Sequence, residues 1–238
     1  MIQLKNPIML ALDVDSDIEA FNILEQIGDQ VGAIKIGPRL NLKYGIGLVE
    51  KIKVFAPVFL DNKFFDITNT VLSSVRMAFD CGATFVTIHA MNGLDTLIQI
   101  KALEEKLNQI RPFKVLCVTI LTSWSESNLP QNLKNQSISH HVLSLTNLVI
   151  ESKLSGLVCS GHELDLIKQK ELFKVVPGIR IEEQIKHQQV QDQKRVMTPK
   201  KAIEAGASAL VIGRSLLNSE NRRQTLHQIL ESLSDEVS

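Results

Sequence analysis

Short apolar runs recur along the chain, and each is followed by a polar or glycine-containing break and then by a stretch with helical periodicity. Inside the runs the apolar residues are nearly continuous and do not alternate cleanly with polar ones. This pattern is typical of strands buried on both faces, as in parallel sheets covered by helices. The expected strands span residues 8–13, 33–37, 58–63, 85–89, 115–120, 156–160, 173–177 and 209–213.

Signals for helix starts lie between these strands. A Ser, Thr or Asp before a helical pattern can accept a hydrogen bond from the first turn, and a Glu three residues later or a Pro at the next position strengthens the signal. The signals are Asp15 or Ser16 before a helix through Gln26, Ser160 with Glu163, and Thr198 before Pro199.

Strand and helix alternate from one end of the chain to the other, without a linker or a low-complexity segment. The eight strand–helix units in 238 residues predict an α/β fold, a (β/α)8 TIM barrel that forms a single domain over residues 1–238. A doubly wound open sheet, which uses roughly five to seven strands, is the alternative.

Two stretches are too polar for this pattern: residues 124–141 after the fifth strand and residues 181–197 after the seventh. In a barrel, the loops that follow the strands form the active face, so long loops there are interpreted as lids over a ligand. A tolerated surface insertion is the alternative for each.

Composition narrows the class of partner. The chain has 26 Lys and Arg against 26 Asp and Glu, and only 5% of its residues are aromatic. A nucleic-acid binder needs a basic excess or a stacking platform, so nucleic acid is not an expected partner. A small phosphorylated ligand stays open, because a neutral total says nothing about local clusters.

Cysteine spacing and hydropathy bear on the compartment. The three cysteines, Cys81, Cys117 and Cys159, lie far apart in apolar settings, which predicts reduced core thiols and no metal site. No segment reaches the ~18 apolar residues of a membrane span, and the N-terminal apolar run stops at Asp13. We therefore expect a cytoplasmic protein without a membrane partner.

One lysine stands inside an apolar strand. Lys35 is flanked by Ile34 and Ile36, and side chains alternate between the two faces of a strand. If the isoleucines face the outer helices, the ammonium of Lys35 enters the barrel mouth. A buried ammonium needs a partner. Asp13, which ends the first strand, is the expected neighbour.

The third strand carries a denser set of charges. Asp61 and Lys63 fall on one face by the two-residue period, and Asp66 follows where the chain is expected to leave the strand. Together with Lys35 they predict an alternating charge cluster at the active end of the barrel. An internal salt-bridge network that only holds strands together is the alternative, but burying so many ions is costly unless a site uses them.

The seventh and eighth strands end in glycine and arginine. Gly178 and Arg180 follow the seventh strand, and Gly213 and Arg214 follow the eighth. In barrels these two positions frequently form a phosphate site, where glycine lets the backbone approach the anion and arginine supplies a fork of donors. Turn glycines and exposed arginines are the alternative.

The run from Asp61 to Thr70 resembles the Asp-x-Lys-x-x-Asp-Ile-x-x-Thr signature of orotidine 5'-phosphate decarboxylase, most like the bacterial single-function form. Departures from this family's usual pattern are Asn62, Phe65 and Thr68, and none of them replaces a charged site residue. Further blocks resemble the family in its order and extend across essentially the whole chain: residues 11–13, 34–37, 118–123, 158–160, 177–180, 192–199 and 211–215.

The resemblance implies the activity and roles for individual residues. The reaction would convert orotidine 5'-monophosphate to uridine 5'-monophosphate and CO2, the last step of UMP synthesis in pyrimidine biosynthesis, without cofactor or metal. Catalysis would rest on Lys63 as proton donor to C6 of the pyrimidine, with Asp61, Asp66 and Lys35. Substrate contacts would come from Asp13, Lys35, Asp61, Ile67, Thr70, Thr122, Pro177, Arg180, Gln193, Gly213 and Arg214.

The same resemblance implies a homodimer with shared active sites, in which Asp66 and Thr70 reach into the neighbouring subunit's site. Chemically, loss of CO2 leaves electrons on C6 with no cofactor as a sink. The site must therefore stabilise negative charge and deliver a proton, which a lysine held between carboxylates can do.

Two other functions stay open. One is a metal-dependent keto-sugar-phosphate decarboxylase or aldolase of the same barrel superfamily, in which carboxylates hold magnesium. Lys35 argues against it, because a cation there would repel the metal. The other is a non-catalytic nucleotide-binding barrel. His89, at the end of the fourth strand, is interpreted as structural, with an acid–base role as its alternative.

Overall fold

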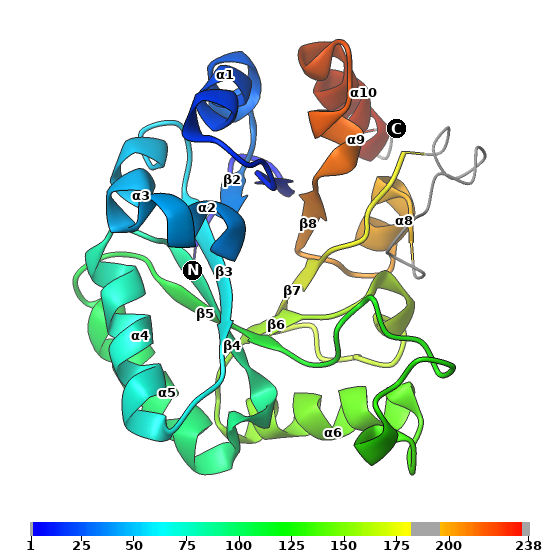
Figure 1. The fold of residues 1–238 in the computed structure, drawn as a ribbon. Coiled ribbons are helices and arrows are strands. Elements are labelled where there is room, and N and C mark those ends of the chain that lie inside the picture. Colours follow the sequence, from blue (N-terminus) through cyan, green and yellow to red (C-terminus); the bar gives the residue numbers. More distant parts are fainter. Residues whose placement is uncertain (1, 182–195, 235–238) are drawn as a thin grey trace.

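The computed structural model describes residues 2–181 and 196–234, and within them eight parallel strands close into a barrel in sequence order. The predicted TIM barrel is confirmed and the open sheet is wrong, because β1 pairs with both β2 and β8. Figure 1 shows the helices arranged around the strands. The strands are β1 Ile8–Ala11, β2 Ala33–Ile36, β3 Val58–Phe64, β4 Phe85–His89, β5 Lys114–Val118, β6 Gly156–Val158, β7 Phe173–Val176 and β8 Ala209–Ile212.

Most strands end one or two residues before the predicted boundary. Asp13 and Gly37, for example, were expected inside strands but lie beyond β1 and β2. Just past the assigned ends, Leu12 N still donates to Lys35 O at 2.9 Å and Cys159 N to Val175 O at 3.2 Å. The sequence pattern therefore extends these strands into the residues where regular pairing stops. The residues concerned form the start of the loops at the active edge of the barrel.

The helices begin where the sequence signals lie. Ser16 accepts a hydrogen bond from Glu19 N, and Thr198 caps the helix that starts at Pro199. Ser160 N donates to Glu163 at 2.9 Å, but this signal opens only a 3-10 turn. The α-helices are α1 Asp17–Ile27, α2 Pro38–Tyr44, α3 Ile46–Ile52, α4 Thr68–Asp80, α5 Leu94–Asn108, α6 Ile138–Glu151, α8 Pro199–Glu204, α9 Arg214–Leu217 and α10 Arg222–Ser234. The 3-10 turns are η1 Gly28–Gln30, η2 Ala90–Asn92, η3 Gln131–Leu133 and η4 Gly161–Glu163.

The core has two layers, which follow from the alternation of side chains in the strands. Ile34 and Ile36 belong to the layer between strands and helices. Met9, Phe59 and Phe85 belong to a second cluster formed by inward-pointing side chains of the barrel. The barrel interior is therefore filled, and a ligand has room only above the filled part, at the barrel's end.

The two polar stretches that were predicted as long loops differ in the structure. In residues 124–141 the prediction of an irregular loop is too long, because α6 begins at Ile138, where Ser137 caps the helix through His140 N at 3.2 Å. Residues 182–195 of the second stretch lie outside the described residues, while Met197 pairs with Ile179 in an isolated parallel bridge. None of the helices described in this structure is long and apolar enough to cross a membrane.

Candidate active site

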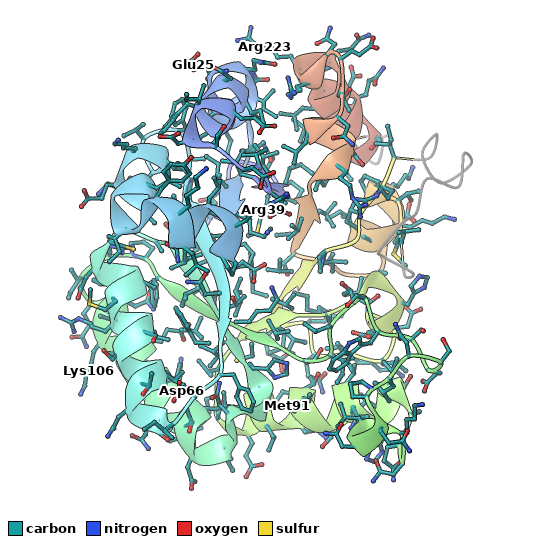
Figure 2. All side chains as sticks on the ribbon, in the orientation of Figure 1. Glu25, Arg39, Asp66, Met91, Lys106 and Arg223 are labelled. Atoms are coloured by element: carbon teal, nitrogen blue, oxygen red, sulfur yellow. The ribbon has the colours of Figure 1, made fainter. Side chains whose placement is uncertain are left out.

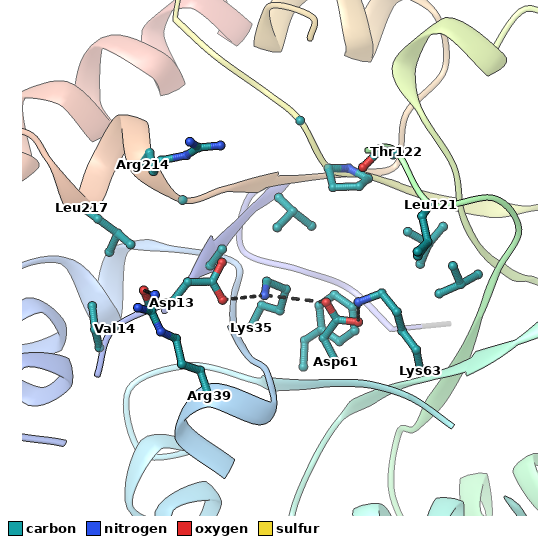
Figure 3. Close-up of a pocket in the computed structure, with 18 of the residues that line it drawn as sticks. Asp13, Val14, Lys35, Arg39, Asp61, Lys63, Leu121, Thr122, Arg214 and Leu217 are labelled. Atoms are coloured by element: carbon teal, nitrogen blue, oxygen red, sulfur yellow. Dashed lines mark hydrogen bonds and ion pairs between the residues drawn. The ribbon is translucent and has the colours of Figure 1, made fainter. Parts of the chain in front are cut away.

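A cavity of about 680 Å³ lies at the carboxyl ends of the strands. Among the described residues, every strand except β4, or the segment that follows it, contributes to its wall. Figure 3 shows Asp13, Lys35, Asp61 and Lys63 on one side, with Arg214 and Thr122 across from them. The predicted site residues that line it are Asp13, Lys35, Asp61, Lys63, Thr122, Pro177, Arg180, Gly213 and Arg214.

The predicted alternation of charges is present in this cavity (Figure 3). Lys35 Nζ lies 3.0 Å from Asp13 Oδ1 and 3.6 Å from Asp61 Oδ2, and Lys63 Nζ lies 2.8 Å from Asp61 Oδ1. The side chains of Lys35 and Asp61 are only 10% and 15% exposed, whereas that of Lys63 is 38% exposed. The two inner members are thus shielded, and the amine of Lys63 is open toward the cavity.

Asp61 is held as a carboxylate. Burial raises the pKa of this group, but the nearby charges of Lys35 and Lys63 and hydrogen bonds from Lys63 and Thr87 outweigh burial. The net result is a pKa of Asp61 below its ordinary value. The site therefore keeps a negative charge beside the amine of Lys63 at neutral pH.

The backbone at Lys63 departs from a regular strand. Leu60 pairs with Val86 and Phe64 with Ile88, so the β3–β4 register shifts between these pairs. Lys63 has φ 50°, in the left-handed region that non-glycine residues seldom adopt. The two-residue period correctly predicted that Asp61 and Lys63 share the cavity, although the ladder between them is not regular.

The loops after β7 and β8 form the other wall of the cavity. Arg180 is a buried side chain whose Nη1 donates to its own neighbour's carbonyl, Ile179 O, at 3.0 Å. Gly178 has φ 81°, a conformation that suits glycine, and it turns the chain between β7 and Arg180. Gly213 and Arg214 approach from β8. This wall thus carries two guanidinium groups, whose geometry suits an anion such as phosphate.

Three predicted residues lie elsewhere. Asp66, Ile67 and Thr70 do not line the cavity among the residues described, and Figure 2 places Asp66 away from Arg39, which borders it. The side chain of Ile67 is exposed at 72%. Thr70 lines a second hollow, of about 460 Å³, together with Asn62. Gln193, the remaining predicted contact, lies outside the described residues.

The loop that carries Asp66 is tied to the neighbouring turn. Asn92 Nδ2 donates to Phe64 O at 2.9 Å and to His89 O at 2.8 Å, and its Oδ1 accepts from Asp66 N at 3.3 Å. Asp66 Oδ1 in turn accepts from Ile67 N at 2.7 Å. One side-chain amide therefore holds the chain where it leaves β3.

His89 faces the same region from β4. Its ring packs against Phe65 with centroids 5.8 Å apart, and its Nδ1 accepts a hydrogen bond from Met91 N at 3.2 Å. Burial, followed by the charge of Lys63, lowers the pKa of His89 below its ordinary value. The neutral ring therefore serves as an acceptor at the end of the strand, in line with a structural role.

Sequence reasoning missed three residues of this site: Arg39, Thr87 and Asn92. Arg39 lines the cavity, donates to Asp13 O at 3.0 Å and pairs with Asp15 at 2.7 Å. Its position three residues after β2, at the active edge of the barrel, is a signal in the sequence for a residue of the site. Thr87 and Asn92 gave no signal, because uncharged polar residues at strand ends are common.

Metal ligands were not expected, and the described residues contain no group of three or more His, Cys, Asp or Glu side chains placed to hold a metal ion. Two carboxylates of the cavity, Asp13 and Asp61, are bridged by the ammonium of Lys35.

Comparisons with known proteins agree over nearly the whole chain. A family described as "Orotidine 5'-phosphate decarboxylase / HUMPS family" matches residues 6–229. Orotidine 5'-phosphate decarboxylase of Actinobacillus pleuropneumoniae serotype 5b (strain L20) is 35% identical over 233 residues, which cover 96% of this chain and 99% of the relative. The enzyme of the same name from Haemophilus influenzae (strain 86-028NP) is 36% identical over 230 residues, covering 95% and 98%.

Solved structures give the same result. The crystal structure of orotidine 5'-phosphate decarboxylase from Lactobacillus acidophilus superposes with a TM-score of 0.82 at 28% identity, covering 96% of this chain and 99% of that one. An uncharacterized conserved protein from Geobacillus kaustophilus superposes with a TM-score of 0.79 at 26% identity.

Proposed function

The chain belongs to the orotidine 5'-phosphate decarboxylase / HUMPS family, and from this premise we infer that it converts orotidine 5'-monophosphate to uridine 5'-monophosphate and CO2, a carboxy-lyase step of pyrimidine biosynthesis. The observation that carries the inference is the unbroken series Asp13–Lys35–Asp61–Lys63, with contacts between 2.8 and 3.6 Å, along one wall of the cavity. Charge arrays of this kind are expected where a reaction develops charge away from water.

The two walls of the cavity would contact different parts of the substrate. Arg180, Gly213 and Arg214, with Pro177, would hold the phosphate, because guanidinium groups match a phosphate's geometry. Asp13 and Lys35 would contact the ribose hydroxyls. Thr122 and Gln193 would hold the base, and the pyrimidine C6 would then lie against Asp61 and Lys63.

In the reaction, the bond between C6 and the carboxyl carbon breaks, CO2 leaves, and the electron pair stays on C6. The ammonium of Lys63 stabilises this charge and then donates its proton to C6. Asp61 keeps that ammonium in place at 2.8 Å, and Lys35 keeps Asp61 ionised from the opposite side at 3.6 Å. Phosphate contacts far from C6 supply binding energy that fixes the ring against the array.

The proposal extends to a homodimer that completes the site. Asp66 and Thr70, the two residues expected to serve a second copy, do not line their own chain's cavity among the described residues, and neither does Ile67. The hollow next to them includes Ile46 and Met77, two exposed apolar side chains. Asn62 also lines it, and its buried Oδ1 makes no hydrogen bond within the described residues. A partner subunit would cover this surface and receive Asp66 beside its own Lys63.

Mixing two inactive variants tests the shared site. Lys63→Ala and Asp66→Ala subunits, unfolded together and refolded as a mixture, would form mixed dimers in which one site has both native residues. About a quarter of the sites would then be complete if subunits pair at random. Recovery of about that share of wild-type activity supports the shared site, and a mixture as inactive as its components contradicts it.

The remaining parts of the proposal are that residues 1–238 act as a single catalytic domain, in the cytoplasm, without a cofactor and without nucleic-acid or membrane partners. The balanced charge of the chain and its lack of a basic excess support the partner statement.

The direct test is an ultraviolet assay. The purified protein is incubated with orotidine 5'-monophosphate in the presence of EDTA, and the spectrum is followed for conversion to uridine 5'-monophosphate. Metal-independent turnover is expected. Activity that EDTA abolishes and magnesium restores would favour the metal-dependent sugar-phosphate alternative, and tight nucleotide binding without turnover would favour a binding protein.

A further inference from the structure

We propose that Thr87 is a positioning residue for the reaction, in which one hydroxyl group fixes both the backbone of Lys63 and the carboxylate of Asp61. The inference rests on the proposed decarboxylase function and adds a residue to it. Thr87 lies in β4 and is fully buried, so it does not itself touch the cavity's contents.

The contacts assign the hydroxyl's proton without ambiguity. Thr87 Oγ1 lies 2.8 Å from Lys63 N and 3.0 Å from Asp61 Oδ1. The amide of Lys63 can only donate, so Oγ1 accepts from it with a lone pair. The single hydroxyl proton is then available for Asp61, which accepts. A threonine or serine hydroxyl supports this donor-and-acceptor arrangement, whereas valine supports neither half.

The hydrogen bond from Lys63 N to Thr87 Oγ1 holds a backbone segment that the regular β3–β4 pairing does not hold. The β3–β4 register shifts between Leu60 and Phe64, so the regular ladder does not hold the segment that contains Lys63. A buried amide needs an acceptor, and the hydroxyl of Thr87 supplies it. Lys63 also has φ 50°, a conformation that persists only when surrounding contacts enforce it. Loss of the hydroxyl would let this residue relax toward an extended backbone and carry its amine away from C6.

The hydrogen bond from the Thr87 hydroxyl also orients the carboxylate of Asp61. Its Oδ1 receives Lys63 Nζ at 2.8 Å and the Thr87 hydroxyl at 3.0 Å, while its Oδ2 faces Lys35 at 3.6 Å. Two hydrogen bonds on Oδ1 and an ion pair on Oδ2 together set the plane of the carboxylate. The neutral donor, Thr87, is fully buried, so it does not compete with substrate.

The test replaces Thr87 by valine, serine and cysteine and measures kcat and KM for orotidine 5'-monophosphate. Thr87→Val keeps the shape and removes the hydroxyl, so kcat is expected to fall about 10²-fold, as for a misplaced catalytic group. KM is expected to stay within about threefold, because the residues proposed to bind the phosphate lie on the other wall of the cavity. Thr87→Ser is expected to retain wild-type kcat, since it keeps the hydroxyl.

If Thr87→Val does not fold, the comparison of Thr87→Ser with Thr87→Cys still tests the proposal. These two variants differ only in the oxygen or sulfur atom, and a thiol is a weak donor and acceptor. Thr87→Cys is therefore expected to have a kcat at least about tenfold below that of Thr87→Ser. The matched control is Thr146→Val, at a buried threonine of α6 whose hydroxyl has no hydrogen-bond partner within the described residues. Its kcat is expected to equal that of the wild type.

Three results would overturn the proposal: wild-type kcat in folded Thr87→Val, equal kcat in the serine and cysteine variants, or a loss in Thr87→Val that appears wholly in KM. Wild-type protein assayed alongside separates this test from that of the decarboxylase function. If the wild type converts the substrate and the variants do not follow the expected order, Thr87 is misassigned. If the wild type shows no conversion, the proposed function itself is wrong.

Discussion

Lys35 and Asp61 project from neighbouring strands into one cavity, with Lys35 Nζ 3.6 Å from Asp61 Oδ2 and both side chains largely shielded from solvent. The ammonium also lies 3.0 Å from Asp13, so it separates two carboxylates that would otherwise face each other. Its charge is the largest single influence that opposes burial and lowers the pKa of Asp61.

Replacing this lysine by methionine is therefore expected to lower both stability and turnover. Lys35→Met leaves two carboxylates without their shared cation, and the free energy of unfolding at neutral pH is expected to fall by about 1–3 kcal/mol. Urea denaturation measures the first effect and the decarboxylation assay the second. Lys106→Met, at an exposed lysine of α5, is the control and is expected to change neither. Equal stability of the two variants would contradict the bridging role of Lys35.

The amine of Lys63 is expected to be indispensable for turnover. Lys63→Ala removes the proton donor and the charge nearest C6, so kcat is expected to fall by at least about 10³-fold. Circular dichroism should show an unchanged fold, since the side chain of Lys63 is 38% exposed. Near-normal turnover in the folded variant would exclude the role assigned to Lys63.

The left-handed backbone of Lys63 gives a second, separate prediction. At φ 50° a residue with a Cβ is strained and glycine is not. Lys63→Gly is therefore expected to be more stable than Lys63→Ala by about 1 kcal/mol, the opposite of the usual effect of glycine in a strand. Denaturation of the two inactive variants side by side measures this difference. A less stable glycine variant would mean that the positive φ is not maintained in solution.

Arg214 offers a test of the phosphate wall. Removing one charge-assisted hydrogen bond to phosphate is expected to raise KM for orotidine 5'-monophosphate about 10- to 100-fold in Arg214→Ala. Arg223→Ala is the control, because Arg223 is exposed on α10, donates to Gln26 O at 2.8 Å and does not line the cavity. Steady-state kinetics measure KM for both variants. An unchanged KM in Arg214→Ala would mean that the phosphate binds elsewhere.

The part of the site that the sequence predicted follows from strand alternation and from the barrel topology, which brings Arg180 and Arg214, after β7 and β8, to the same cavity as Asp61. Ile34 and Ile36 in the outer layer determine where Lys35 points, and runs of apolar residues locate every strand within about two residues. Asp61 and Lys63 were placed together for the same reason.

The parts of the site that strand alternation and barrel topology did not predict depend on local irregularity. Thr87 matters because the β3–β4 register shifts beside it, and no periodicity reports such a shift. Asp66 and Thr70 lie close to Lys63 in sequence, yet they turn away from the cavity once the chain leaves β3. The proposal that they serve a second copy rests on the family resemblance and on their absence from the lining of this cavity among the described residues.

His89 gives a prediction about pH, because burial and then the charge of Lys63 lower its pKa in the folded protein. In the unfolded chain the ring titrates near its ordinary value of 6.5. Above that pH both states hold a neutral ring, and His89 has no effect on the pH dependence of stability. Below it the unfolded chain binds a proton that the folded protein resists, so the free energy of unfolding falls with pH until the lowered pKa is passed.

The comparison is between the wild type and His89→Asn, whose side-chain oxygen can still accept from Met91 N. Other titrating groups are shared, so the difference in their free energies of unfolding isolates His89. From pH 8 to pH 5 the wild type is expected to lose stability relative to the variant, by at most about 1.4 kcal/mol for each pH unit below the ordinary value. Urea denaturation at several pH values measures the difference. A constant difference, or one that favours the wild type as pH falls, would show that the folded protein accepts the proton on His89 and that the ring is not held neutral beside Lys63.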